Sequence, residues 1–177
     1  QTGAAWAKMP KTQRQALQSY TGNGYGKINQ SLWSGNPSGA AKSAAQAMMT
    51  HAHDIAPGTI LSRKIDASNS LKKELMNSVG KVLQEPAVSS TSIRPTAWSG
   101  SVQIKMTVGS GVKGMWVGEG SKGSGGCISV NCSEDEMLLP PNTRMLVQKV
   151  NNPSKKDKDG FGGNGMTVIE VLLLPSH

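Results

Sequence analysis

Aromatic residues and cysteines are scarce in this chain of 177 residues. It contains four Trp, two Tyr and one Phe, and only two Cys. Two cysteines exclude a small scaffold held together by many disulfides. No apolar run approaches the roughly 20 residues that a membrane-spanning helix needs, so the sequence predicts no such helix. A chain of this length is long enough to bury a hydrophobic core as one domain.

Acidic residues are also few, and the charge balance is basic. Nineteen Lys and Arg against 11 Asp and Glu give a formal net charge of +8 at pH 7. A positive surface attracts anionic ligands and acidic partners. Proteins that bind single strands of nucleic acid usually combine such charge with aromatic stacking platforms. The scarcity of aromatic residues therefore weakens an interpretation as a nucleic-acid-binding protein.

Potential metal ligands form no convincing cluster. Cys127 and Cys132 have four residues between them, and the spacing leaves open whether they form a disulfide or remain two thiols. Without further Cys or His at ligand spacing they make a poor zinc site. His51 and His53 are two residues apart and do not share a helix face. We expect no metal site. Gln1 follows no basic and apolar leader, so we expect a mature product or a domain cut from a longer protein.

The order of periodic patterns predicts helices first and strands second. Helical patterns cover residues 11–19, 27–33, 38–51 and 70–83, with a glycine-rich loop over 20–26. Alternating patterns predict strands over 59–65, 102–108, 115–117, 137–139, 143–150 and 167–174. Residues 151–165 are predicted to form a hairpin loop that is too polar to pack. This order indicates an α+β fold with antiparallel sheet, a single domain over 1–177 that is helical over 1–56 and β-rich over 57–177.

Three consecutive acidic residues, Glu134, Asp135 and Glu136, form a local negative field in a basic chain. If this segment enters the strand at 137–139, side chains alternate between faces. Glu134 and Glu136 then point to one face and Asp135 points to the other. Two carboxylates on one face suit split acid–base or electrostatic roles. The alternative interpretation is a solvated turn.

Arg63 and a run of hydroxyl residues are the other candidates for chemistry. Arg63 lies within an otherwise apolar strand, and a guanidinium on a sheet face favours a bidentate anionic partner such as phosphate or carboxylate. An exposed strand arginine is the alternative. All four residues of Ser89–Ser92 carry hydroxyl groups, which could orient a carboxylate or a ligand through hydrogen bonds. An ordinary strand or loop segment is the alternative there.

An arginine, a Ser-Thr-Ser motif and a Glu-x-Glu motif, in that order and each at a predicted strand, resemble the mono-ADP-ribosyltransferases of the Arg–Ser–Glu class. That family includes the bacterial exoenzymes that modify Rho and the binary toxins that modify actin. The matching segments are 20–32, 59–63, 90–92 and 134–142. The chain departs from the family at Trp33, where arginine is usual, and at Lys64, where glycine is usual. The family usually has a glycine and an arginine before the next strand, and this chain has Gly100-Ser101 there, without the arginine. Arg94 in the same loop is the candidate to take the place of that arginine.

The resemblance implies a fold and a reaction. The fold would be N-terminal helices packed on two antiparallel β-sheets, a split β-sandwich with NAD in a cleft. The reaction would transfer ADP-ribose from NAD to a protein arginine, with some NAD glycohydrolase activity and no metal. Glu136 would stabilise the cationic transition state, Glu134 would engage the acceptor arginine, Ser90 would orient Glu136, and Arg63 would hold an NAD phosphate or ribose. The residues implied to bind NAD are Arg63, Ser90, Thr91, Ser92, Asn29 and Arg94.

The resemblance also implies partners and a place of action. The partners would be NAD and a target protein with an accessible arginine, and the catalytic domain would be monomeric. The chain would be secreted, injected or carried by a phage, and would act in the cytoplasm of a target cell. Two alternatives stay open: a nucleic-acid acceptor, which the net charge of +8 favours, and a non-catalytic protein-binding module on the same fold.

Overall fold

The computed structural model describes residues 8–117, 129 and 135–176, and the chain divides into two compact units. The first unit comprises residues 1–54, 85–90 and 113–142, and the second comprises 55–84, 91–112 and 143–177. Two of the five boundaries fall inside strands, in β3 (Val82–Glu85) and β4 (Ser89–Ser92). These two strands therefore contribute residues to both units.

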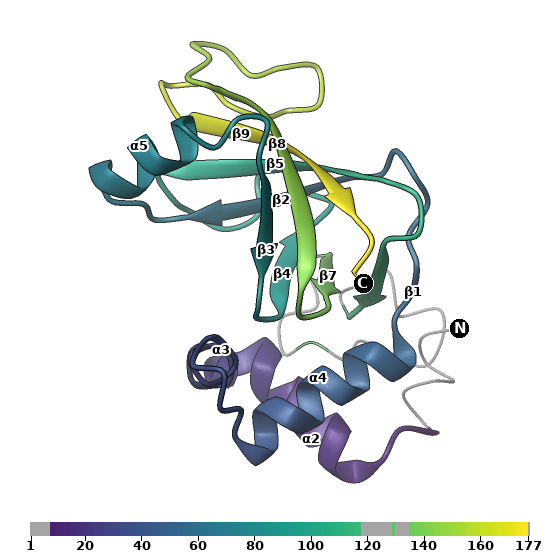
Figure 1. Ribbon diagram of the computed structural model, residues 1–177. Coiled ribbons are helices and arrows are strands. Elements are labelled where there is room, and N and C mark those ends of the chain that lie inside the picture. Colours follow the sequence, from purple (N-terminus) through teal and green to yellow (C-terminus); the bar gives the residue numbers. More distant parts are fainter. Residues whose placement is uncertain (1–7, 118–128, 130–134, 177) are drawn as a thin grey trace. The chain divides into compact units, whose positions relative to one another are not determined.

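Helices α2 (Lys11–Ser19), α3 (Tyr25–Trp33) and α4 (Gly39–His51) pack together in the first unit (Figure 1). Helix α4 begins at the cap residue Ser38, whose hydroxyl accepts a hydrogen bond from the Ala41 backbone N–H. Its fully buried residues are spaced three or four apart, which places them on one helix face. These residues are Ala41, Ala44, Ala47 and Met48. Because most of them are alanines, the neighbouring helices can approach closely.

The segment η1 (Tyr20–Gly24) joins α2 to α3 through a kink at Gly22, whose φ of −102° and ψ of −131° are not helical. The predicted loop over 20–26 is therefore reduced to this kink, and Tyr20 anchors the segment in the core. Tyr20 is 2% exposed, and its phenol donates a hydrogen bond to the Val88 carbonyl at 2.8 Å. A Cβ at Gly24 would lie 2.7 Å from the Ser19 carbonyl oxygen, so this turn requires glycine there.

Three short strands complete the first unit: β1 (His53–Asp54), β6 (Lys113–Trp116) and β7 (Glu136–Leu139). They pair antiparallel in the order β1-β6-β7. Met115 of β6 lies opposite Leu138 of β7, and both side chains join the core formed by the helices. The core therefore ties the start of β7 to α2, α3 and α4.

The second unit is built on one sheet with the strand order β4-β2-β5-β9-β8-β3. Its long strands are β2 (Ile60–Ile65), β5 (Val102–Val108), β8 (Thr143–Asn151) and β9 (Thr167–Leu174) (Figure 1). The predicted α+β class and the mostly antiparallel pairing are confirmed. The β5–β9 pair differs from the prediction, because β9 lies between β5 and β8 and runs parallel to β5.

Helix α5 (Asn69–Met76) is shorter than the predicted helix over 70–83. The Ser68 hydroxyl caps its first turn by accepting from the Leu71 N–H. Beyond Asn77 the chain turns at Gly80, whose φ is +83°, and the Gly80 N–H donates to the Val147 carbonyl of β8. Residues 82–85 then form β3. The helical sequence pattern includes Val82 and Leu83, but these residues form a strand because β3 pairs with β8.

The register of β2 against β5 separates two chemically different faces of the sheet. Directly opposite residues on paired strands point to the same face. Leu61 lies opposite Met106 and Arg63 lies opposite Ile104, which gives one largely apolar face. The intervening pairs are polar and occupy the other face: Ser62 with Lys105, and Lys64 with Gln103. Arg63 is therefore a half-buried cation on the apolar face.

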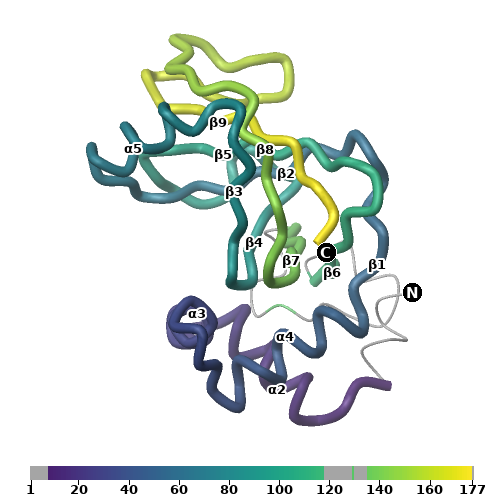
Figure 2. The backbone as a smooth tube through the Cα atoms, in the orientation of Figure 1, coloured from purple at the N-terminus to yellow at the C-terminus, as the bar shows by residue number. Residues whose placement is uncertain are grey.

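The loop that connects β8 to β9 (Figure 2) contacts Lys105 and Gln103 on the polar face, so the prediction that it is too polar to pack is wrong. Phe161 is 2% exposed, and the Lys105 ammonium lies 5.2 Å from its ring centroid. The same ammonium lies 2.6 Å from an Asp157 oxygen and 2.7 Å from an Asp159 oxygen. The second Asp157 oxygen accepts hydrogen bonds from the N–H groups of Asp159 and Phe161. One lysine of the sheet thus anchors the loop through its two aspartates.

This anchor shifts the titration of its members. Burial alone would lower the pKa of Lys105 and raise the pKa of Asp157. The hydrogen bonds and charges of Asp157 and Asp159 outweigh burial and hold the pKa of Lys105 above its usual value. The hydrogen bonds from Lys105 and from two backbone N–H groups likewise hold the pKa of Asp157 below its usual value.

We expect Lys105→Met to destabilise the protein by about 1–3 kcal/mol, because two aspartates lose their charged hydrogen-bond donor. The lowered pKa of Asp157 contributes stability above its unfolded value of 3.8, and this contribution is lost as pH falls through the folded value. The free energy of unfolding, measured with urea, should therefore fall less between pH 7 and pH 3 in Lys105→Met than in the wild type. Identical pH profiles for the two proteins would contradict the assignment.

Candidate active site

Glu136, the first residue of β7, has a buried carboxylate. The residue is 4% exposed, and its Oε2 atom accepts a hydrogen bond of 3.0 Å from the Ser129 hydroxyl. Its backbone carbonyl accepts from the Val117 N–H at 3.0 Å, and the Val117 carbonyl accepts from the Ser129 N–H at 2.9 Å. Val117 therefore links the backbone of Glu136 to the backbone of Ser129, which brings the Ser129 hydroxyl to the Glu136 carboxylate.

The predicted alternation over 134–136 is wrong at Asp135. Asp135 has φ +45°, in the left-handed region, and β7 begins only at the next residue. A residue in that conformation does not continue the pleat of a strand. Asp135 is also 9% exposed, so two consecutive acidic residues are buried here. Glu134, Cys127 and Cys132 lie outside the described residues.

Ser90 belongs to a buried hydrogen-bond network of the first unit. Its hydroxyl lies 3.5 Å from the Tyr20 phenol oxygen. Asn29 of α3 is 4% exposed and donates from its amide nitrogen to the Val88 carbonyl at 3.1 Å and to the Tyr20 oxygen at 3.2 Å. Helix α3 is thereby tied to the backbone that leads into Ser90, which is itself half-buried.

The remaining predicted site residues lie in the second unit. Arg63 stands on β2, on the apolar face already described. Ser92 of β4 lies opposite Ser62 of β2, and both Thr91 and Ser92 are fully buried. The Ser92 hydroxyl accepts a hydrogen bond of 3.0 Å from the Arg94 N–H, and the Arg94 side chain is exposed. The predicted residues thus form two groups, one with the carboxylate and one with the arginines.

Two contributors were not predicted from the sequence. Ser129 supplies the hydrogen bond to Glu136, but a lone serine in a glycine-rich segment carries no recognisable signal. Tyr20 organises the network around Ser90; it begins the matching segment 20–32, but no role in the site was predicted for it. Trp33, which occupies the position of the family's usual arginine, is 53% exposed and donates its indole N–H to the Glu85 carboxylate at 2.5 Å.

The chemistry available to these residues is that of carboxylate, hydroxyl and guanidinium groups. Among residues 8–117, 129 and 135–176, no group of three His, Cys, Asp or Glu side chains is placed to hold a metal ion. None of the helices described is long and apolar enough to cross a membrane. A buried carboxylate can stabilise a developing positive charge, and a half-buried arginine can bind an anion.

Comparison with known proteins identifies the fold. The sequence matches no protein family profile and no curated protein. Solved structures match over nearly the whole chain. Plx2a, an ADP-ribosyltransferase toxin from Paenibacillus larvae, has a TM-score of 0.69 at 16% identity, covering 98% of this chain and 91% of that one.

Two further solved structures agree. An ADP-ribosyltransferase from Clostridium botulinum has a TM-score of 0.67 at 18% identity, covering 97% of this chain and 92% of its own. The Clostridium limosum C3 exoenzyme has a TM-score of 0.69 at 18% identity, with 98% and 89% covered. The chain therefore has the fold of the bacterial ADP-ribosyltransferase toxins.

Proposed function

We propose that this chain is an NAD-dependent mono-ADP-ribosyltransferase that modifies an arginine of a target protein. The observation that carries the proposal is the buried Glu136 carboxylate, held by Ser129 at the first residue of β7. It belongs to a Glu-x-Glu motif in a chain with the fold of ADP-ribosyltransferase toxins. Burying a carboxylate is unfavourable unless partners compensate it, so a buried glutamate is a strong candidate for a functional group.

The reaction needs a carboxylate beside a cation that exists only transiently. The bond between the nicotinamide nitrogen and the ribose carbon breaks, and nicotinamide leaves with the bonding electrons. Positive charge develops on the ribose, as in glycoside hydrolysis. An acceptor nitrogen of arginine then bonds to the same carbon and releases a proton. A carboxylate at the position of Glu136 stabilises this transition state more than the ground state, which is the requirement for catalysis.

The other site residues are proposed to bind and orient NAD. Arg63 would pair with a phosphate or a ribose hydroxyl, and the exposed Arg94 would supply a second cation for phosphate. Ser90 would orient Glu136, and Thr91 and Ser92 would support the binding strand. Asn29 would contribute by holding that strand, because its amide nitrogen is already bonded to Val88 and Tyr20.

Glu134 supports arginine as the acceptor. A carboxylate two residues before the catalytic one can hold a guanidinium through paired, charge-assisted hydrogen bonds and help to deprotonate it. The toxin names of the structural neighbours support a secreted or injected protein that acts inside a target cell. The net charge of +8 keeps a nucleic-acid acceptor as the second candidate.

Replacing Glu136 tests the proposal most simply. With labelled NAD and a host-cell lysate, Glu136→Gln should lower label transfer by on the order of a hundred-fold or more, because the cationic transition state loses its counter-charge. The exposed Glu74 of α5 offers a matched control, and Glu74→Gln should transfer label like the wild type. Digestion of the labelled product with protease or nuclease identifies the acceptor. No transfer by the wild type to any acceptor, with no release of nicotinamide, would refute the proposal.

Replacing Glu134 separates acceptor binding from cleavage of NAD. We expect Glu134→Gln to abolish modification of arginine while retaining measurable NAD hydrolysis, since water needs no guanidinium site. Nicotinamide release and label transfer are followed in the same sample. Equal loss of both activities would show that Glu134 does not act on the acceptor side.

Ser129 is proposed as a positioning residue for Glu136. A hydrogen bond to a charged group contributes about 1.5–3 kcal/mol, so Ser129→Ala should lower kcat by roughly ten- to a hundred-fold. KM for NAD should change little, and Ser129→Thr, which keeps the hydroxyl, should restore kcat. A loss of kcat in Ser129→Ala that Ser129→Thr does not reverse would argue against this role.

A further inference from the structure

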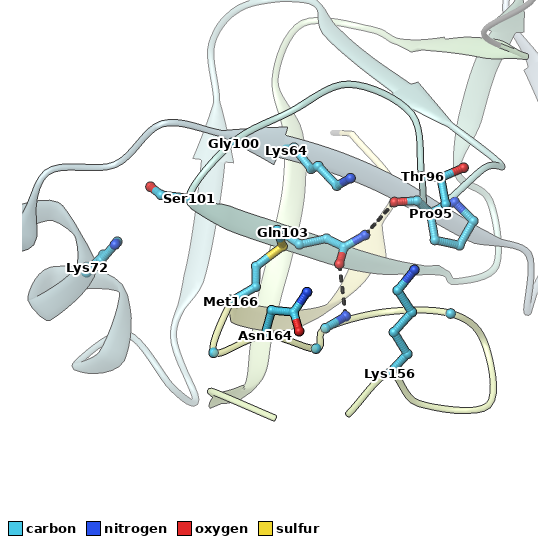
Figure 3. Close-up of a pocket in the computed structure, with 14 residues that line it drawn as sticks. Lys64, Lys72, Pro95, Thr96, Gly100, Ser101, Gln103, Lys156, Asn164 and Met166 are labelled. Atoms are coloured by element: carbon cyan, nitrogen blue, oxygen red, sulfur yellow. Dashed lines mark hydrogen bonds between the residues drawn. The ribbon is translucent and has the colours of Figure 1, made fainter. Parts of the chain in front are cut away.

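A basic pocket of about 560 Å³ lies in the second unit, and none of the residues assigned above lines it (Figure 3). Lys64 of β2, Lys72 of α5 and Lys156 of the β8–β9 loop line it. Two hydroxyl residues, Thr96 and Ser101, and a glycine-rich turn over 160–165 complete the wall. Its volume falls in the range of small-molecule sites, about 300–1,000 Å³.

The strand register places this pocket on the polar face of the sheet. Lys64 lies opposite Gln103, and both line the pocket. Arg63, the neighbour of Lys64 on β2, points to the other face because side chains alternate along a strand. A ligand in this pocket would therefore not contact the arginine that we propose for NAD.

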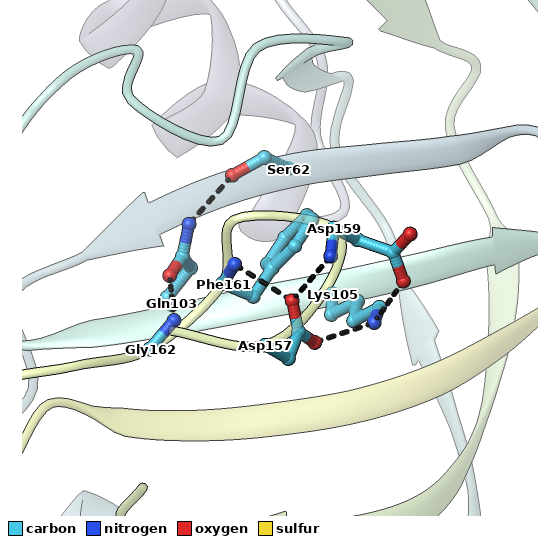
Figure 4. A network of polar contacts seen from close by, with 7 residues as sticks. All are labelled: Ser62, Gln103, Lys105, Asp157, Asp159, Phe161 and Gly162. Atoms are coloured by element: carbon cyan, nitrogen blue, oxygen red, sulfur yellow. Dashed lines mark hydrogen bonds and ion pairs between the residues drawn. The ribbon is translucent and has the colours of Figure 1, made fainter. Parts of the chain in front are cut away.

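Gln103 gives the pocket a fixed floor (Figures 3 and 4). Its side chain is 2% exposed, and its three hydrogen bonds reach different parts of the chain. The amide nitrogen donates to the Pro95 carbonyl at 2.8 Å and to the Ser62 hydroxyl at 3.2 Å, and the amide oxygen accepts from the Gly162 N–H at 3.0 Å. The pocket is thus preformed, which lowers the entropy cost of binding a ligand.

The lysines of the pocket have no carboxylate beside them in its lining, as far as the described residues go. The two aspartates of the loop, Asp157 and Asp159, both pair with Lys105. Burial, and then the nearby charge of Lys156, lower the pKa of Lys64. The Lys64 ammonium donates a hydrogen bond to the Trp98 carbonyl at 3.2 Å, which leaves donors for a ligand. A bound anion would reduce the electrostatic repulsion between the lysine ammonium groups in this concave site.

The glycine-rich turn favours close approach of such an anion. Gly162, Gly163, Asn164 and Gly165 are consecutive residues with positive φ, a conformation that glycine adopts without strain. Glycines place no side chain between the backbone and a ligand. The hydroxyl of Thr96 adds a donor that suits phosphate oxygens, whereas the Ser101 hydroxyl already donates to the Ala67 carbonyl and accepts from the Ala67 N–H.

We propose that this pocket binds a compact anion that carries three or more negative charges on its phosphate groups, unlike the pyrophosphate bridge of NAD, which carries two. Three lysines match several negative charges, and lysine binds phosphate as a point charge. A volume near 560 Å³ fits a compact polyphosphate. A nucleic-acid strand would instead need an extended basic groove with stacking aromatic rings, and among the described residues no aromatic side chain lines this pocket. The inference does not rest on the proposed transferase activity.

Inorganic tripolyphosphate serves as the probe, with binding measured by isothermal titration calorimetry on the full chain. We expect the double substitution Lys64→Gln with Lys156→Gln to weaken binding at least ten-fold, since it removes two of the three cations. The double substitution Lys81→Gln with Lys149→Gln is the matched control: it removes the same charge from exposed lysines of the same unit that do not line the pocket. The control should bind like the wild type.

Single substitution of the exposed Lys156 guards against loss of folding, and Lys156→Gln should weaken binding with an unchanged melting temperature. Excess NAD should not displace tripolyphosphate, and Arg63→Gln should leave its affinity unchanged. If the double substitution in the pocket and the control substitution weaken the affinity for tripolyphosphate equally, the anion is attracted by net charge only. That result would overturn the proposal. Displacement by NAD would also overturn it, because the pocket would then be part of the NAD site.

Discussion

Burial of the Glu136 carboxylate requires the contacts that the first unit places around it. A charged group removed from water is unfavourable unless hydrogen bonds replace its hydration. The first unit supplies that replacement through Ser129, and Val117 holds both residues through its backbone. The helical core in turn fixes β6 and β7, because Met115 and Leu138 pack with α2, α3 and α4. These contacts together hold the Glu136 carboxylate in a defined position within this unit.

In the second unit, the pair of strands β2 and β5 has one apolar face and one polar face. The register of β2 against β5 directs Arg63 to the apolar face and Lys64 to the polar face. Lys105 and Gln103 then attach the β8–β9 loop to the polar face through Asp157, Asp159 and Gly162. A shift of the register by one residue would exchange the two faces. The same pairing that positions Arg63 thus also creates the basic pocket.

Much of the fold could be predicted from periodicity, and the exceptions have physical causes. The patterns over 11–19, 102–108 and 167–174 predict their elements to the residue, because local preference and burial agree there. Glycine-rich 20–26 is kinked only at Gly22, while Tyr20 before the kink is buried in the core. Residues 82–85 form a strand because the neighbouring chain pairs with β8. The polar loop packs because Lys105, distant in sequence, neutralises its aspartates. The sequence motifs predict Glu136 and Arg63 as site residues, whereas Ser129 is identified only by its hydrogen bond to Glu136 in the structure.

The proposed transferase would break the bond between nicotinamide and ribose and pass ADP-ribose to a guanidinium. The most direct measurement uses purified protein, NAD and a small soluble guanidine compound, with the products separated and weighed by mass spectrometry. We expect free nicotinamide together with a covalent adduct of ADP-ribose and the guanidine compound, with nicotinamide in excess of the adduct by the amount of NAD that is hydrolysed. Intact NAD after prolonged incubation with active, folded protein, or nicotinamide release without any adduct, would contradict the proposal.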